Sequence, residues 1–99
     1  MSNLNRVIIT GRLIADPIVK YAKNEVAIAK FKLQVQAGTE NKKNFIQCVA
    51  WGGLAKVCKE YLKKDRLVAV EGRLQIKGSI TEVIVDNMQM LDYKTEEVK

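Results

Sequence analysis

The sequence predicts an all-β domain with one α-helix, folded as a five-stranded Greek-key barrel in which the helix lies between the third and fourth strands. The chain has 99 residues, which suits one domain with one core. Five segments have the alternation or β-branched composition of strands, and one segment has the 3.6-residue period of a helix. Their order matches the barrel known as the OB-fold. We assign residues 1–92 to this domain and 93–99 to a short polar tail.

Three strands are predicted in the first half of the chain. Residues 5–13 alternate between an apolar and a basic face, and residues 25–37 have the cleanest period of two in the sequence. The segment between them, residues 15–25, contains the only proline and a turn-forming asparagine, and is predicted to be a connection. Residues 38–44 form a polar loop that leads into the third strand, residues 44–51.

The second half is predicted to contain the helix and the last two strands. Residues 53–65 place apolar side chains at i, i+3, i+4, i+7 and i+8, which predicts about three helical turns. Lys63 and Lys64 would then lie in the last turn, at the negative end of the helix dipole. Residues 66–76 and 79–91 are predicted strands, joined by a tight hairpin of Lys77, Gly78 and Ser79.

The composition argues against several classes of function. The chain contains no histidine, so it lacks the commonest general base and metal ligand. Its two cysteines, Cys48 and Cys58, have nine residues between them, which fits free buried thiols better than a metal site. We therefore expect no catalysis, no metal and no cofactor. No apolar window suits a membrane span or a signal peptide, so we expect a cytoplasmic protein. The net charge of +6 indicates an anionic partner.

The third predicted strand carries two large aromatic residues on one face. Alternation places Phe45, Gln47 and Trp51 on the side opposite to the compact apolar set. A buried amide between two rings would need hydrogen-bond partners, so we expect Phe45 and Trp51 to face outward. The set expected to face the barrel interior is Ile46, Cys48 and Ala50.

Exposed aromatic rings beside lysines are the pattern that holds single-stranded nucleic acid, because bases stack on the rings while cations contact the phosphates. Lys30 and Lys32 share one strand face, and Lys42 and Lys43 lead into the aromatic strand. The sequence therefore predicts a binding surface for single strands. An alternative is that Trp51 packs over the helix start or in a subunit interface.

Blocks of sequence along nearly the whole chain resemble the bacterial single-stranded-DNA-binding protein family. These blocks are NRVIITGRLIADPIVKYAKNEVAIAKFKL, NFIQCVAWGGLAKVCKEYLKKD, VEGRL and TEVIVDNMQML, in that order. The resemblance implies an OB-fold that forms homo-oligomers, with a tetramer built as a dimer of dimers favoured over a dimer. It also implies sequence-tolerant binding of single-stranded DNA in replication, recombination or repair, without catalysis or a cofactor.

The resemblance also implies positions for the binding residues. Phe45 and Trp51 match stacking aromatics of the family, and residues 5–9 match the edge used for dimerisation. The residues expected to contact DNA are Arg12, Lys30, Lys32, Lys42, Lys43, Phe45, Gln47, Trp51, Lys64, Arg73, Gln75 and Lys77. The residues expected in the dimer interface are Asn5, Arg6, Val7, Ile8 and Ile9.

Several features depart from the family pattern. The loop of residues 38–44 and the hairpin of residues 77–79 are short and lack the aromatic residues often found there. Glu25 and Asp65 replace glycines that are usual at a turn and at the helix end. We therefore expect weaker binding and a smaller site than in relatives with long loops. The final residues, DYKTEEVK, lack the family's acidic tip, so we expect no recruitment of partner proteins through such a tip.

Two other OB-fold functions compete with this interpretation. A primosome-like subunit would act mainly through protein contacts and bind DNA weakly, and the missing loop aromatics favour it. An RNA chaperone of the cold-shock type also uses a barrel with exposed aromatics, but the order of the blocks does not match that class.

Overall fold

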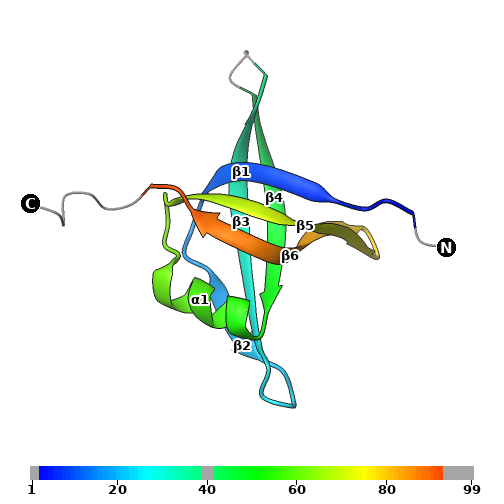
Figure 1. The fold of residues 1–99 in the computed structure, drawn as a ribbon, viewed down its shortest axis with the longest axis vertical. Coiled ribbons are helices and arrows are strands. Elements are labelled where there is room, and N and C mark those ends of the chain that lie inside the picture. Colours follow the sequence, from blue (N-terminus) through cyan, green and yellow to red (C-terminus); the bar gives the residue numbers. More distant parts are fainter. Residues whose placement is uncertain (1–2, 39–41, 93–99) are drawn as a thin grey trace, which may run out of the picture.

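A computed structural model describes residues 3–38 and 42–92, and it confirms a strand barrel with one helix (Figure 1). The predicted tail of residues 93–99 and the centre of the polar loop, residues 39–41, lie outside the described residues. The elements are β1 (Val7–Leu13), β2 (Ile18–Tyr21), β3 (Ala27–Ala37), β4 (Lys42–Trp51), α1 (Gly53–Tyr61), β5 (Leu67–Lys77) and β6 (Ile80–Met90).

Five strands close the barrel. They hydrogen-bond in the order β1-β5-β6-β4-β3, and β3 pairs back with β1 at Arg12↔Gln34 and Leu13↔Leu33. The pairing of β4 with β6 is parallel, and the other pairs are antiparallel. In chain order, α1 lies between the third and fourth strands of the barrel, β4 and β5, as predicted.

The predicted connection of residues 15–25 is wrong in part, because it contains the strand β2. Ile18 pairs with Lys30 and Tyr21 pairs with Ala27, so β2 runs along the first half of β3. Pro17 has no amide hydrogen to donate, and the ladder that β1 forms with β3 is interrupted before it. β2 therefore resumes the pairing of β1 along the same neighbour.

The helix is shorter than predicted and ends at Tyr61 instead of Asp65. Leu62 already has extended backbone angles, and Lys63 and Lys64 lie in the connection to β5. They therefore do not complement the helix dipole in the way that the sequence suggests. None of the described residues forms a helix long and apolar enough to cross a membrane.

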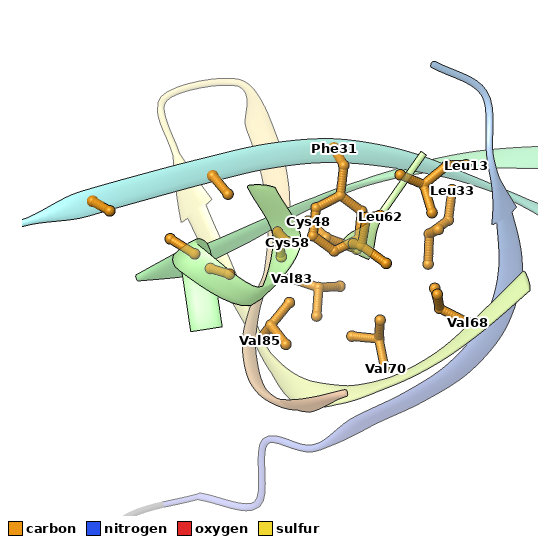
Figure 2. Packing of buried hydrophobic residues seen from close by; sticks show 14 residues of the cluster. Leu13, Phe31, Leu33, Cys48, Cys58, Leu62, Val68, Val70, Val83 and Val85 are labelled. Atoms are coloured by element: carbon orange, nitrogen blue, oxygen red, sulfur yellow. The ribbon is translucent and has the colours of Figure 1, made fainter. Parts of the chain in front are cut away.

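The core fills the barrel between the strands and α1 (Figure 2). Leu13, Leu33, Val68 and Val70 are almost fully buried. Cys48 and Cys58 are also buried and free, as predicted. Desolvation by burial is the main cause that raises the pKa of Cys48 to about 12 and that of Cys58 to about 11, so both thiols stay protonated at neutral pH. They act as small apolar core residues.

The last two strands form a long hairpin that projects beyond the barrel (Figure 1). Its turn has two residues, Gly78 and Ser79, and Lys77 belongs to β5 instead of the turn. A register shift follows Glu71, where a side chain on Gly72 would overlap the carbonyl group of Ile84. This bulge lets β5 bend where the barrel ends and the hairpin arm begins.

Within residues 3–38 and 42–92, two residues other than glycine have a positive φ angle, Glu25 at 66° and Asp65 at 75°. Both are positions where the resemblance noted in the sequence implies a glycine in relatives. Glu25 lies in the turn between β2 and β3, where its amide donates to the Ala22 carbonyl oxygen at 2.8 Å. This bond and the bond from the Ala22 amide to the Val26 carbonyl oxygen at 2.9 Å hold the turn, although the left-handed conformation is unfavourable for a residue with a Cβ atom.

We predict that Glu25→Gly raises the free energy of unfolding by about 0.5–1 kcal/mol. Relief of the left-handed conformation contributes about 1–2 kcal/mol, and the larger entropy of glycine in the unfolded chain offsets part of it. Urea unfolding measures the change. Lys23→Gly, in the same turn but without a positive φ, should destabilise the protein. Equal losses in both variants would contradict the assignment of strain to Glu25.

Candidate nucleic-acid interface

Strand β4 presents two aromatic side chains to solvent. Phe45 is 55% exposed and Trp51 is 48% exposed, while Cys48 and Ala50 on the other side of the strand are fully buried. This is the orientation that the alternation of β4 predicts. Trp51 leaves about half of its surface open to solvent, so a ligand can reach the indole.

Neighbouring strands place polar and basic residues beside these rings. On β3, Lys30 pairs with Val49 and Lys32 pairs with Gln47, so both lysines share the outward side of β4. We call this surface the β3–β4 face. It consists of Lys30, Lys32, Gln34, Phe45, Gln47, Val49 and Trp51. On the far side of β4, strand pairing extends the β3–β4 face to Glu82 and Ile84 of β6. These two residues pair in turn with Gln75 and Arg73 of β5.

A buried carboxylate lies in the middle of this surface. Glu82 is 5% exposed and is the one buried charged side chain among residues 3–38 and 42–92. The Nε2 atom of Gln47 donates to Glu82 Oε2 at 2.5 Å. Sequence reasoning missed Glu82, although an acid directly before the apolar run of residues 83–85 was a signal. A phosphate above Glu82 would be repelled by the negative charge of its carboxylate. An anionic chain is therefore favoured on either side of Glu82, where the cations lie.

The lysines of the face are available to a ligand. Lys30, Lys32 and Lys43 are exposed, and in the part of the chain that the structure describes no hydrogen bond or ion pair holds their ammonium groups. Lys43 lies on the same side of β4 as Phe45, and Lys42 lies on the opposite side. Alternation therefore directs Lys43 to the β3–β4 face and Lys42 away from it.

Both predicted arginines already have acidic partners. The Nη1 atom of Arg12 donates to the Asp65 carbonyl oxygen at 2.9 Å and lies 3.5 Å from Asp92 Oδ2. The Nη1 atom of Arg73 lies 2.8 Å from Asp86 Oδ1. These pairs are at least one-third exposed on each side, and such pairs contribute at most about 1 kcal/mol. A phosphate can therefore compete for either guanidinium.

Not all predicted contact residues lie together. Arg12 pairs with Gln34, which pairs with Phe45, so Arg12 marks the β1 margin of the face. Lys64 lies in the connection after α1, where its backbone amide donates to Asp16 at 2.8 Å. Lys77 lies at the tip of the β5–β6 arm. The structure brings together Lys30, Lys32, Lys43, Phe45, Gln47, Trp51, Arg73 and Gln75.

Trp51 borders a groove. Its other lining residues come from β5 and β6 and include Arg73, Gln75 and Asp86. The groove measures about 400 Å³ and has both an aromatic wall and a guanidinium. This combination suits a flat ring that carries a negative charge on its substituent.

The residues predicted for a dimer interface lie elsewhere, on β1 and just before it. The Asn5 side chain bridges the Leu74 backbone, accepting from its amide at 2.9 Å and donating to its carbonyl oxygen at 3.0 Å. Arg6 forms an ion pair with Glu71. Ile8 is 70% exposed, and residues 7–11 have a strand partner on one side only within the described chain. An unpaired edge of this kind is a template for another strand.

Comparison with known protein families gives one match that covers most of the chain. Residues 4–91 match the single-strand binding protein family. The curated relatives include the single-stranded DNA-binding protein of Oceanobacillus iheyensis, 36% identical over 92% of this chain and 65% of its own length. Single-stranded DNA-binding protein A of Bacillus subtilis is 38% identical over 92% of this chain and 61% of its own length. The chain thus spans somewhat less than two thirds of these relatives.

Solved structures give the same result for the fold. The chain superposes on a deletion mutant of the single-stranded DNA binding protein from Thermus aquaticus with a TM-score of 0.82 and 30% identity. The match covers 92% of this chain and 42% of that one. The wild-type Thermus aquaticus protein gives a TM-score of 0.81 and 28% identity. The OB-fold barrel predicted from the sequence is therefore confirmed.

Proposed function

Because the chain belongs to the single-strand binding protein family, we propose that it binds single-stranded DNA on the β3–β4 face, without sequence preference and without catalysis. The observation that carries this proposal is the exposure of Phe45 and Trp51 on one side of β4. Trp51 lies six positions after Phe45, which places the two residues roughly 20 Å apart along the strand. Bases stacked on each ring contribute about 1–3 kcal/mol apiece.

The charges around the rings support a path for the DNA backbone. Lys30 and Lys32 lie on the β3 side of the rings, and Arg73 lies on the β5 side. Glu82 between them keeps phosphates away from the centre of the row. Bases therefore face the strand surface while phosphates follow the lysines, with Arg12 and Lys43 near the Phe45 end and Gln75 near Glu82. Lys42, Lys64 and Lys77 have a peripheral role in attracting the strand.

The relatives suggest where such binding acts. Proteins named for single-stranded DNA binding occur in Bacillus and Oceanobacillus. We place this chain in the bacterial cytoplasm, where replication, recombination and repair expose single strands. Domain 1–92 carries the binding in this proposal.

Substitution of the two rings tests the proposal. We predict that Trp51→Ala and Phe45→Ala each weaken binding of oligo-dT by about 1–3 kcal/mol, because each removes one stacking platform. Fluorescence anisotropy of a labelled oligomer measures the affinity. In the unmodified protein, the same oligomer should quench the Trp51 fluorescence, and the affinity should fall as salt rises, by about 0.7 log units per decade for each phosphate neutralised.

The matched control is Tyr61→Ala. Tyr61 is 49% exposed, about the same as Trp51, but it lies on α1 and not on β3 or β4. Its removal should leave the affinity unchanged. If all three variants bind like the parent, or if the tryptophan signal does not respond to DNA, the β3–β4 face is not the binding site.

We also propose that copies of this chain associate, as a dimer of dimers. The free edge of β1 and the exposed Ile8 support a first interface at residues 5–9, in which β1 strands of two copies pair. The β5–β6 arm supports a second interface, because it exposes Leu74, Ile76 and Ile80. A tetramer of this kind gives one DNA strand several β3–β4 faces to follow.

Light scattering tests the association. We predict that Ile8→Glu lowers the molar mass in solution, because it places unpaired charges opposite each other across the first interface. Ile18→Glu, an equally drastic change at a side chain that is 63% exposed on β2, should leave the mass unchanged. An unchanged mass in Ile8→Glu would contradict the interface at β1.

A further inference from the structure

A second groove lies on the other side of the face, between β2 and β3. Its lining is mostly apolar, its volume is about 260 Å³, and its residues are Ile18, Lys20, Ile28 and Lys30. Sequence reasoning took the β2 segment for a connection and therefore missed it. The groove exists because β2 adds a further strand beside β3.

The register aligns this groove with Trp51. Lys20 pairs with Ile28, and Ile28 pairs with Trp51, so these three side chains form one row on the outward side of three strands. The adjacent row runs from Ile18 through Lys30 to Val49. Two strand spacings separate the backbones of Lys20 and Trp51, which is roughly 10 Å. The groove is thus a direct continuation of the β3–β4 face.

Its chemistry alternates between apolar and cationic groups. Ile18 is 63% exposed, and Ile28 is half-buried beside it, so the two side chains make an apolar floor. Lys20 and Lys30 stand at opposite corners of this floor and are both exposed. The lining contains no acid, whereas Asp86 lines the groove on the other side of Trp51.

We propose that this groove holds one nucleotide of the bound DNA strand, adjacent to the nucleotide stacked on Trp51. Its base lies on Ile18 and Ile28, and its phosphates contact Lys20 and Lys30. This inference rests on the proposed function. It extends the binding path from β4 across β3 to β2. The added contacts on β2 offset part of the binding surface that the short loops do not provide.

The charges favour DNA over a second protein copy as the occupant. A protein interface here would bury two lysines without an acidic partner in the groove, and unpaired buried charges are costly. A nucleotide supplies both a flat apolar surface for the isoleucines and an anion for the lysines. One ligand of this class satisfies all four side chains.

Two variants with different signatures test the subsite. Ile18→Ser removes apolar floor and should weaken binding of an oligo-dT of about 16 nucleotides several-fold, with no change in the salt dependence. Lys20→Gln should weaken the same binding and make the slope of log K against log salt shallower by about 0.7. In both variants, saturating oligo-dT should still quench Trp51 to the parental extent, because the Trp51 platform is intact.

Lys23→Gln is the matched control, because Lys23 carries the same charge in the turn after β2 but does not line the groove. It should leave the slope and the affinity for the oligomer unchanged. Equal changes in Lys20→Gln and Lys23→Gln would overturn the subsite, as would parental binding of the oligomer by Ile18→Ser. Failure of the proposed function is distinguishable, since oligo-dT would then not quench Trp51 in the unmodified protein.

Discussion

The register of β4 is the constraint on which the core and the candidate site both depend. This strand pairs with β3 on one side and with β6 on the other, at positions such as Cys48↔Phe31 and Cys48↔Val83. One set of its side chains therefore completes the barrel interior, and the alternate set carries Phe45 and Trp51. A shift of one residue would bury the aromatic rings and expose the core set. The hydrophobic core thus fixes the orientation of the proposed binding surface.

The same pairing creates the least expected feature of the face, an acid within the surface that we propose binds an anion. Gln47 and Glu82 are neighbours because β4 and β6 pair at these positions, and Gln47 donates a hydrogen bond to one oxygen of the buried carboxylate. Cations then lie around this point instead of over it. In the proposed complex, this arrangement orients the DNA strand, because it favours bases above Glu82 and phosphates on either side of it.

The sequence was sufficient for features that depend on local periodicity. The alternation in β3 and β4 is long enough to identify both strands and the outward direction of Trp51. β2 was missed because four residues after a proline carry too little pattern to distinguish a strand from a connection. The helix end was misplaced because Leu62 and Lys63 continue the helical period, while the extended backbone of Leu62 and the left-handed conformation of Asp65 end the helix.

Features that depend on distant partners could not be predicted in the same way. Gln47 and Glu82 are 35 positions apart, and Arg12 and Asp92 are 80 positions apart. Only the closed barrel brings these pairs together, so the sequence could not show that Arg12 has acidic partners or that Glu82 is buried. The groove at β2 likewise depends on the pairing of Ile18 with Lys30, which follows from the missed strand.

The most direct test of the central claim is a map of backbone amide chemical shifts by NMR as oligo-dT of about 10 nucleotides is added. We expect the largest changes in β3 and β4, centred on Phe45 and Trp51, with further changes in β2 and near Arg73. Residues 7–10 of β1 should change little. Changes concentrated in β1, with β4 unaffected, would contradict the assignment of the binding surface.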